Sequence, residues 1–282
     1  METYNNNGYN IYKNILDLKK INIIYDKIIY ILNNISKEKK EFTIDYPQIL
    51  EEKIDYIYNK LHDIYIDDSD YYFELVKSNG IFSNILEIKK IFFSDKILNI
   101  INSLNINNIS VPITAQVHLF CDFATNINYR NGKLGLDTHQ DWPQMRGSLN
   151  NIVIWIALNN INDNNCPLEI INKSHLNGYL DGKNDIKLDN RKILTDYKED
   201  EFIKINLNIG DAICFSSWLI HKTGIFKNNE KFRFAISLRY NDLDDPYFIE
   251  NKFKIAYNTI MNRDDNQTRI PRQEEILNYF NL

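Results

Sequence analysis

Cysteine is scarce in this 282-residue sequence, and its three cysteines form no Cys-x-x-Cys pair. The odd set of Cys121, Cys166 and Cys214 fits a reducing compartment better than a disulfide framework. The chain opens without a basic-then-apolar leader pattern, and no apolar run approaches the length of a membrane span. We therefore expect a cytoplasmic protein without a membrane partner.

An excess of basic residues is also missing. The 33 lysines and arginines are outnumbered by 38 acidic residues, which gives a formal net charge of -5 and no electrostatic footprint for nucleic acid. Hydrophobic residues make up 44% of the chain and charged residues 25%, enough for a sizeable core and a polar surface. Because the sequence has no internal repeat and no flexible linker, we expect one integrated domain with three regions.

Helical periodicity dominates residues 1–110, which we expect to pack as a helical region on the core. Residues 12–33 are periodic, and Ser94 is a candidate N-cap for a further helix. His62 is alone among these residues, and a surface or core histidine explains it better than a ligand. Residues 51–64 carry one apolar stripe, formed by Ile54, Ile57, Leu61 and Ile64.

Short apolar runs of strand length, separated by Gly, Asn and Asp clusters, fill residues 111–241. The polar stretch 181–201 is expected to be an excursion over the barrel mouth. Residues 242–282 form a C-terminal extension with a short helix at 274–280. Eight strands without helices between them favour a jelly roll or related barrel. They are predicted at 114–120, 136–141, 151–158, 168–171, 202–206, 211–215, 218–223 and 232–240.

His139 and Asp141 lie two residues apart, so in an extended segment both side chains point to one face. An imidazole and a carboxylate on one face are two ligands of a facial metal triad, which a second histidine would complete. His221 is the best candidate, because an apolar strand tolerates a histidine only when it is hydrogen-bonded or metal-bound. A satisfied core histidine is the plain alternative for His221.

Arg233 lies between Phe232 and Phe234 on a predicted strand and must face the opposite side from them. A guanidinium directed into a barrel needs an anion, ideally a carboxylate held by two hydrogen bonds. The alternative is a salt bridge on an outer face. Together with the two histidines and Asp141, an inward arginine is far more specific than any one of these residues.

With these residues in order, the sequence resembles the phytanoyl-CoA dioxygenase family. The resemblance covers residues 111–241 and is strongest in three segments, Thr138-His139-Gln140-Asp141-Trp142-Pro143, Ile154-Trp155-Ile156-Ala157-Leu158 and Pro167-Leu168-Glu169-Ile170-Ile171-Asn172-Lys173-Ser174-His175. It implies a non-haem Fe(II), 2-oxoglutarate-dependent oxygenase on a double-stranded β-helix, a jelly-roll, cupin-like core with helical flanks. Such enzymes oxidise 2-oxoglutarate to succinate and carbon dioxide with O2.

The resemblance also assigns roles to individual residues. His139, Asp141 and His221 would bind iron, and Arg233 would hold the distal carboxylate of 2-oxoglutarate. Thr223 would add a hydroxyl contact to the same cosubstrate. Gln116 would point toward the cosubstrate cavity, and Trp155 would line this cavity, with a core tryptophan as the equal alternative.

The turn that contains His175 departs from the family pattern. Asn172-Lys173 replaces the usual Pro-Gly, and Cys166 replaces a usual Gly, which puts the loop geometry in doubt but not the triad. We expect His175 to be structural.

The substrate is expected to be a small molecule, with a carbohydrate or natural-product intermediate among the candidates. Trp142 and Arg146 follow the His-x-Asp triplet on the expected substrate side, where Arg146 either meets an anionic group or is a solvated loop charge. Because Asp141 keeps the carboxylate that related iron halogenases lack, hydroxylation is favoured over halogenation. Two alternatives stay open: a catalytically silent jelly-roll binding protein, and a cupin-like metal enzyme that does not use 2-oxoglutarate.

Overall fold

The computed structural model describes residues 2–35, 47–77, 80–111, 115–125, 136–181, 183–185, 191–255 and 271–280. Its α-helices are α1 (Glu2–Asn7), α2 (Leu18–Ile35), α3 (Leu50–Asp67), α4 (Ser69–Val76), α5 (Leu86–Phe92), α6 (Asp95–Ser103), α7 (Asp122–Thr125), α8 (Trp142–Met145), α9 (Pro246–Glu250) and α10 (Gln273–Tyr279). Its strands are β1 (Tyr9–Tyr12), β2 (Ile109–Ser110), β3 (Gln116–Cys121), β4 (Ile152–Ala157), β5 (Leu168–Ile170), β6 (Lys183–Asp185), β7 (Arg191–Ile193), β8 (Ile203–Ile205), β9 (Ala212–Ser216), β10 (His221–Thr223) and β11 (Phe232–Asp242).

Two antiparallel sheets form the core of the molecule. The six-stranded sheet has the order β1-β9-β4-β11-β2, with β3 also paired to β11, and the three-stranded sheet has the order β10-β5-β8. One buried apolar cluster contains residues of both sheets, including Trp155 and Ile213 from the large one and Ile170 and Ile205 from the small one. The two sheets therefore face each other across a shared interior, as a double-stranded β-helix requires.

Strand β11 explains how the sequence divides the large sheet into two faces. Its odd-numbered side chains, from Arg233 to Arg239, face the interior between the sheets, while Phe234 and Tyr240 on the even-numbered side belong to the helix-covered cluster. Every residue of β11 is buried, as is typical of a central strand covered on both faces.

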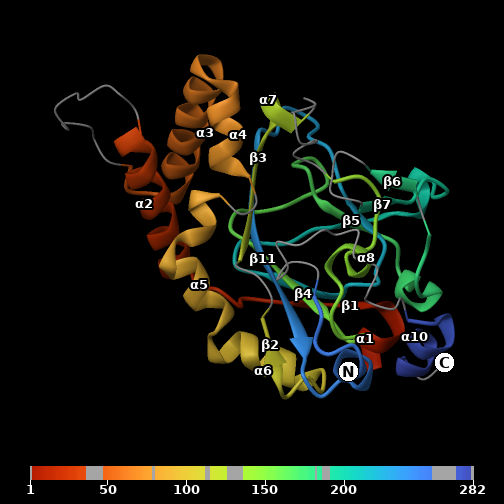
Figure 1. The fold of residues 1–282 in the computed structure, drawn as a ribbon. Coiled ribbons are helices and arrows are strands. Elements are labelled where there is room, and N and C mark those ends of the chain that lie inside the picture. The colour runs from red at the N-terminus through yellow and green to blue at the C-terminus, as the bar shows by residue number, and fades with distance from the viewer. Residues whose placement is uncertain are drawn as a thin grey trace.

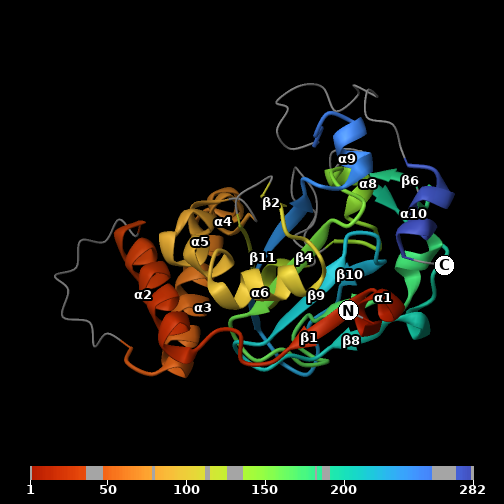
Figure 2. The ribbon, with the colours of Figure 1, turned by 90° about the horizontal axis from the view of Figure 1, so that it is seen from below.

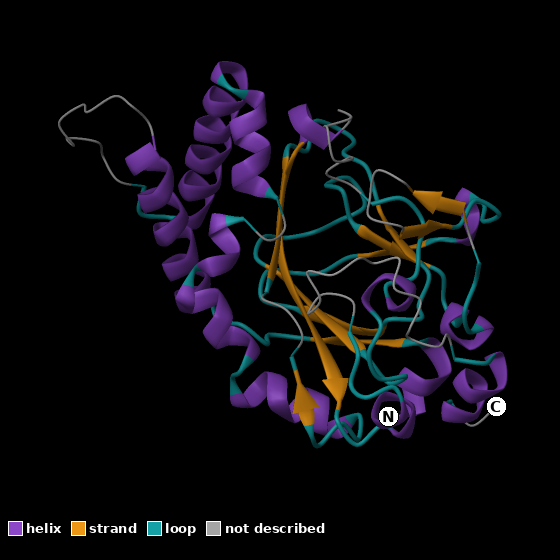
Figure 3. Ribbon diagram, in the orientation of Figure 1, coloured by secondary structure: helices purple, strands orange, loops and turns teal. Residues whose placement is uncertain are grey.

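Helices from the first part of the chain cover the outer face of the large sheet, as Figures 1 and 3 show. Ile21, Ile28 and Leu32 on α2 and Ile57 and Leu61 on α3 are buried in the same cluster as the even-numbered face of β11. Figure 2 shows α2 to α6 on one side of the strands and α9 and α10 on another. None of the described helices has the length and apolarity needed to cross a membrane.

The predicted helices are present, with shifts at their ends. The periodic stretch 12–33 becomes a helix only from Leu18, because Tyr9–Tyr12 pairs with β9 as the edge strand of the large sheet. Ser94 occupies the N-cap of α6, but its hydroxyl donates to the Ile91 carbonyl and makes no cap hydrogen bond. The 274–280 helix corresponds to α10.

One predicted strand is wrong, and a second is wrong in part. Residues 136–141 form no strand: only His139 makes an isolated bridge, and Asp141 has helical backbone angles at the start of α8. Of residues 218–223 only His221–Thr223 is strand, because Trp218 to Ile220 form the turn that follows β9. The polar stretch 181–201 contains the β6-β7 ribbon, and Thr114 at the start of a predicted strand lies outside the described residues.

Candidate metal centre

A hydrogen-bonded pair of backbones brings the two histidines together. His139 and His221 exchange both N–H to carbonyl hydrogen bonds, each 3.0 Å long, in an isolated antiparallel bridge. Side chains of directly opposed residues project to the same side, so the imidazole centroids lie 4.2 Å apart. This bridge joins two segments that are far apart in the sequence.

Asp141 completes the group from the N-cap position of helix α8. Its Oδ1 lies 3.3 Å from His139 Nε2 and 3.7 Å from His221 Nε2. The three side chains offer ligand atoms that all lie within 4.8 Å of one another, and all three residues are buried. Gln140 points elsewhere and donates to the carbonyls of Gly178 and Trp218. The side chains of His139 and Asp141 do meet, although Asp141 has helical backbone angles and not the extended backbone on which the prediction rested.

The surroundings fix which imidazole nitrogen is available to a metal. His139 Nδ1 lies 2.6 Å from the Asp137 carbonyl, and His221 Nδ1 lies 2.9 Å from the Leu219 carbonyl. A carbonyl only accepts, so Nδ1 carries the proton in each neutral ring and Nε2 keeps its lone pair. Burial, followed by the neighbouring His139, lowers the pKa of His221 to about 3, which favours this neutral form. Histidines whose Nδ1 atoms are anchored by carbonyls present unprotonated Nε2 atoms, which suit a divalent metal.

The Asp141 carboxylate is held charged by an arginine. Burial alone would raise its pKa, but the Arg239 guanidinium, followed by the two histidines, outweighs burial and holds the pKa of Asp141 well below its ordinary value. Arg239 donates to Oδ2 from Nη2 at 2.7 Å and from Nε at 3.1 Å. His139, Asp141 and His221 together provide the two-histidine, one-carboxylate donor set of non-haem iron sites.

Arg233 lies in the interior between the sheets, as its alternation on the strand predicts. It is 2% exposed, and its guanidinium stacks over the rings of Phe120 at 4.1 Å and Trp155 at 5.6 Å. Nη1 donates to the Cys166 carbonyl at 2.7 Å, whereas Nε has no hydrogen-bond partner among the described residues. Burial lowers the pKa of Arg233, and no described carboxylate forms an ion pair with it. Such a cation fits an anionic ligand.

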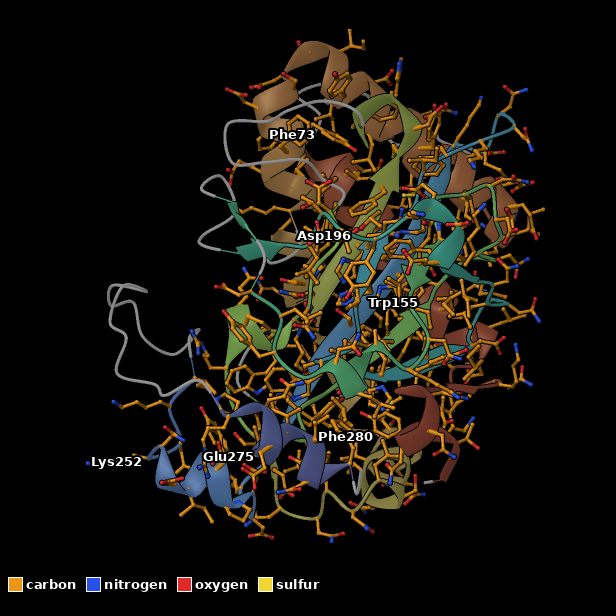
Figure 4. All side chains as sticks on the ribbon, turned by 90° about the vertical axis from the view of Figure 1, so that its right-hand side faces the viewer. Phe73, Trp155, Asp196, Lys252, Glu275 and Phe280 are labelled. Carbon is orange, nitrogen blue, oxygen red and sulfur yellow. The ribbon has the colours of Figure 1, made fainter. Side chains whose placement is uncertain are left out.

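The other predicted cosubstrate residues lie around the same interior. Gln116 on β3 accepts from Arg239 Nη1 and is thereby connected through Arg239 to Asp141. Thr223 lies on the same short strand as His221, and its Oγ1 accepts from the Leu136 N–H at 3.0 Å. Figure 4 shows Trp155 in the middle of the strand region, whereas Phe73 lies among the helices and Phe280 near the C-terminal helix.

Trp142 and Arg146 belong to a different part of the structure. The Trp142 indole is fully buried, stacks on Trp218 at 4.5 Å and donates to the Ser148 carbonyl in a separate apolar cluster. Arg146 lies over the Trp142 ring at 5.5 Å, and burial lowers its pKa. The structure therefore places these two residues next to each other, with Trp142 in the cluster of Trp218 and not in the cluster of Trp155 between the sheets.

Two interior residues are missing from the sequence-based site. Arg239 braces Asp141, and His118 on β3 lies 2.8 Å through Nε2 from the Ser237 hydroxyl and 6.4 Å from the Trp155 ring. Burial, followed by the guanidiniums of Arg233 and Arg239, holds the pKa of His118 well below its ordinary value. The interior thus carries two cations, a neutral imidazole and a three-residue donor set.

Comparisons with a family model and with solved structures both find similar proteins. A model of the family described as phytanoyl-CoA dioxygenase (PhyH) matches residues 72–235. No curated protein matches the chain. Among solved structures, the apo form of the non-heme monooxygenase ThoJ aligns with 86% of this chain and 76% of its own, at 15% identity and a TM-score of 0.57.

Two further structures are similar at lower identity. The ThoJ–nickel complex has 14% identity and a TM-score of 0.52, with the same shares covered. HygX from Streptomyces hygroscopicus, with nickel and 2-oxoglutarate bound, has 8% identity and a TM-score of 0.51 over 86% of this chain and 84% of its own. The TM-scores indicate a shared fold, and at identities this low the similarity shows the fold alone. It confirms the predicted double-stranded β-helix.

Proposed function

The chain belongs to the phytanoyl-CoA dioxygenase family, and we propose that it hydroxylates a small molecule while oxidising 2-oxoglutarate to succinate and carbon dioxide. It is a non-haem iron, 2-oxoglutarate-dependent oxygenase, as the sequence predicts. What we propose beyond this is the hydroxylation outcome, the small-molecule substrate and the roles of individual residues. One observation carries it: a buried His-Asp-His donor set shares an interior with a buried arginine that has no acidic partner among the described residues.

His139, Asp141 and His221 would hold Fe(II) through two Nε2 atoms and one carboxylate oxygen. The chain's own contribution is to keep these atoms in place, through the backbone bridge between the histidines and the carbonyls that anchor each Nδ1. Iron held by these three residues would supply the oxidative chemistry, with 2-oxoglutarate and O2 as cosubstrates.

Arg233 would hold the distal carboxylate of 2-oxoglutarate. Its Nε is unpartnered among the described residues, and its stacking on Phe120 and Trp155 fixes the plane of the fork. The Thr223 hydroxyl already accepts from a backbone N–H, so its own proton is free to be donated to the same carboxylate. Gln116 and Trp155 would contact the cosubstrate from β3 and β4.

The retained Asp141 carboxylate favours hydroxylation over halogenation, because it fills the place that a halide ion takes in the halogenases. The two alternatives from the sequence are less well supported. A silent binding protein has no need to keep the complete donor set, and a metal enzyme without 2-oxoglutarate has no need of a buried, acid-free Arg233. Arg146 remains the proposed contact for an anionic group of the substrate, with Trp142 beneath it.

The test is succinate formation by the purified chain supplied with Fe(II), ascorbate, O2 and 2-oxoglutarate, measured with and without candidate small molecules. We expect slow succinate formation alone and faster formation with the true substrate. His221→Ala should abolish both, whereas His62→Ala, a substitution of an exposed histidine on α3, should change neither. Equal succinate formation by wild type and His221→Ala would reject the assignment of His221 as a ligand.

A further inference from the structure

We propose that Arg239 is a positioning residue that makes Asp141 a one-oxygen metal ligand. This inference rests on the proposed function, because it assumes that Asp141 binds the metal. It concerns a residue that the sequence pattern does not single out.

The two oxygens of Asp141 have separate surroundings. Oδ1 is the oxygen that lies near the histidine Nε2 atoms, at 3.3 and 3.7 Å. Oδ2 accepts two hydrogen bonds from Arg239, from Nη2 at 2.7 Å and from Nε at 3.1 Å. A carboxylate whose second oxygen is bound by a charged fork cannot turn that oxygen to a metal without breaking both contacts.

Arg239 is itself held in place. Its remaining terminal nitrogen, Nη1, donates to Gln116 Oε1 on β3 and lies 3.4 Å from the Ser237 hydroxyl on β11. The residue is 7% exposed and sits on a strand paired to β4, with Arg239 opposite Val153. The guanidinium is therefore held by side chains of both β3 and β11, and its bond to Gln116 helps to orient it.

The backbone around Asp141 explains why such a brace is needed. Asp141 is not in a strand but precedes the four-residue helix α8, so no ladder of backbone hydrogen bonds fixes the direction of its side chain. The histidines, in contrast, are fixed by their mutual bridge and by the carbonyls at Nδ1. Arg239 supplies to Asp141 the orientation that backbone contacts supply to the histidines, and one-oxygen binding keeps the remaining metal positions open.

The test compares cobalt(II) binding in wild type, Arg239→Met and Arg239→Lys, with Arg233→Met as the matched control. Calorimetric titration without 2-oxoglutarate gives the metal affinity, and the visible absorption of bound cobalt reports its coordination. Arg239→Met should bind cobalt about 10- to 100-fold more weakly and with an altered spectrum. Arg239→Lys should recover part of the affinity, because it keeps the charge but not the fork.

Arg233→Met should keep the wild-type cobalt affinity and spectrum while losing 2-oxoglutarate affinity. A fourth variant, Gln116→Leu, removes a partner of Arg239 without touching Asp141 and should weaken cobalt binding by a smaller factor. If Arg239→Met does not fold, unchanged affinity and spectrum in both Arg239→Lys and Gln116→Leu would overturn the inference.

Other outcomes separate this inference from the proposed function. Cobalt affinity within twofold of wild type in folded Arg239→Met overturns the positioning role, and an accompanying loss of 2-oxoglutarate affinity would make Arg239 a cosubstrate contact instead. Failure of the wild-type chain to bind cobalt or iron at all would reject the metal site itself.

Discussion

At the scale of single residues, the interior of the barrel is shaped by two arginines that share one strand face but meet different partners. Arg233 stacks on aromatic rings and has no acid beside it among the described residues, while Arg239 is paired with Asp141. A buried cation without an anion is costly, so the first is suited to a ligand and the second to a permanent structural contact. The two arginines therefore predict different phenotypes.

Replacing Arg233 should affect the cosubstrate and not the metal. A buried charge-assisted contact typically contributes a few kcal/mol, so Arg233→Ala should weaken 2-oxoglutarate binding by about 100-fold. The 2-oxoglutarate affinity of Arg233→Lys should lie between those of wild type and Arg233→Ala, because lysine keeps the charge and loses the planar fork. Anaerobic titration with 2-oxoglutarate, followed by the absorption of the iron chelate, measures this. Superimposable titration curves would remove Arg233 from the site.

Replacing Asp141 should leave Arg239 without its anion. Asp141→Gly should lose hydroxylation and bind iron or cobalt much more weakly, since a ligand is gone. The Nε and Nη2 donors of Arg239 would then face vacated space, so chloride should strengthen metal binding in this variant, whereas sulfate should not. The double variant Asp141→Gly/Arg239→Met is the control and should not respond to chloride. Undiminished metal affinity in Asp141→Gly would show that Asp141 is not a ligand.

The residues that the sequence predicts are those with a motif or an unusual setting. The His-x-Asp spacing and the arginine between two phenylalanines can be recognised in the sequence, and the structure brings their side chains into one interior. Arg239 and His118 carry no such motif. Strand alternation contained the signal, since Arg239 shares its parity with Arg233 and His118 with Gln116, but alternation cannot reveal which inward residue lies beside which.

At the scale of elements, the turns at Cys166 and Lys173 have left-handed backbone at residues other than glycine. Cys166 has φ of 60° and Lys173 has φ of 64°, and these are the two positions where the family pattern usually has glycine. The replaced glycines put the geometry of these loops in doubt, yet both positions keep the left-handed conformation that glycine favours. The left-handed conformation at Cys166 also helps to aim its carbonyl at Arg233, so the turn supports the site.

Lys173→Gly should stabilise the protein. A non-glycine residue in this conformation costs about 1 kcal/mol, part of which is offset because glycine makes the unfolded chain more flexible, so the net gain should be about 0.5 kcal/mol. The Lys173 side chain is exposed. Urea unfolding of wild type, Lys173→Gly and Lys173→Ala measures the effect, with the alanine variant expected to show no gain. Equal stability of the glycine and alanine variants would mean that the backbone is not strained here.

The start of helix α9 should make stability depend on pH. Asp245 caps this helix by accepting from the Phe248 N–H at 2.7 Å, and burial raises its pKa to about 6. A carboxyl whose folded pKa exceeds its unfolded value of about 3.9 contributes stability below pH 4 and loses it as the pH rises through 6. Asp245→Asn keeps the cap and should be more stable than wild type above pH 6, by at most about 3 kcal/mol.

The check is the difference in unfolding free energy between wild type and Asp245→Asn from pH 4 to pH 8. Taking the difference cancels the titration of other carboxyl groups. A difference that stays constant over this range would contradict the raised pKa of Asp245.

Element prediction succeeded where burial produces a pattern and failed where it does not. Strands β4 and β9 are apolar on both faces, and α3 has a clear stripe, so each is visible in the sequence. The 136–141 segment reads as extended, yet its partner is a single residue, and β1 hides in a stretch rich in asparagine and tyrosine. In both segments the backbone conformation depends on pairing with a segment that is distant in sequence, and a local sequence pattern does not reveal that pairing.

At the scale of the whole molecule, contacts distant in sequence close the structure around the site. The first residues of the chain are tied to the strand region by β1, by the Lys13 contact to buried Asp211 at 2.8 Å, and by His175 Nε2, which donates to the Asn5 carbonyl at 2.8 Å. His175 thus has the structural place that the sequence predicts. The group of His139, Asp141 and His221 likewise joins the start of α8 to the start of β10.

Because the proposed metal ligands come from two distant segments, metal should stabilise the folded chain as a whole. A ligand that binds only the folded state adds about 2.7 kcal/mol at a concentration 100 times its dissociation constant. For a chain of this size each kcal/mol raises the Tm by about 2–4 °C, so saturating nickel(II), which resists oxidation, should raise it by about 5 °C or more. Calorimetric melting of metal-free and nickel-loaded protein measures the shift, and a chelator should reverse it. His221→Ala should melt at the same temperature with and without nickel, since one of the two segments no longer supplies a ligand. A nickel-dependent shift of wild-type size in that variant would place the metal elsewhere on the chain.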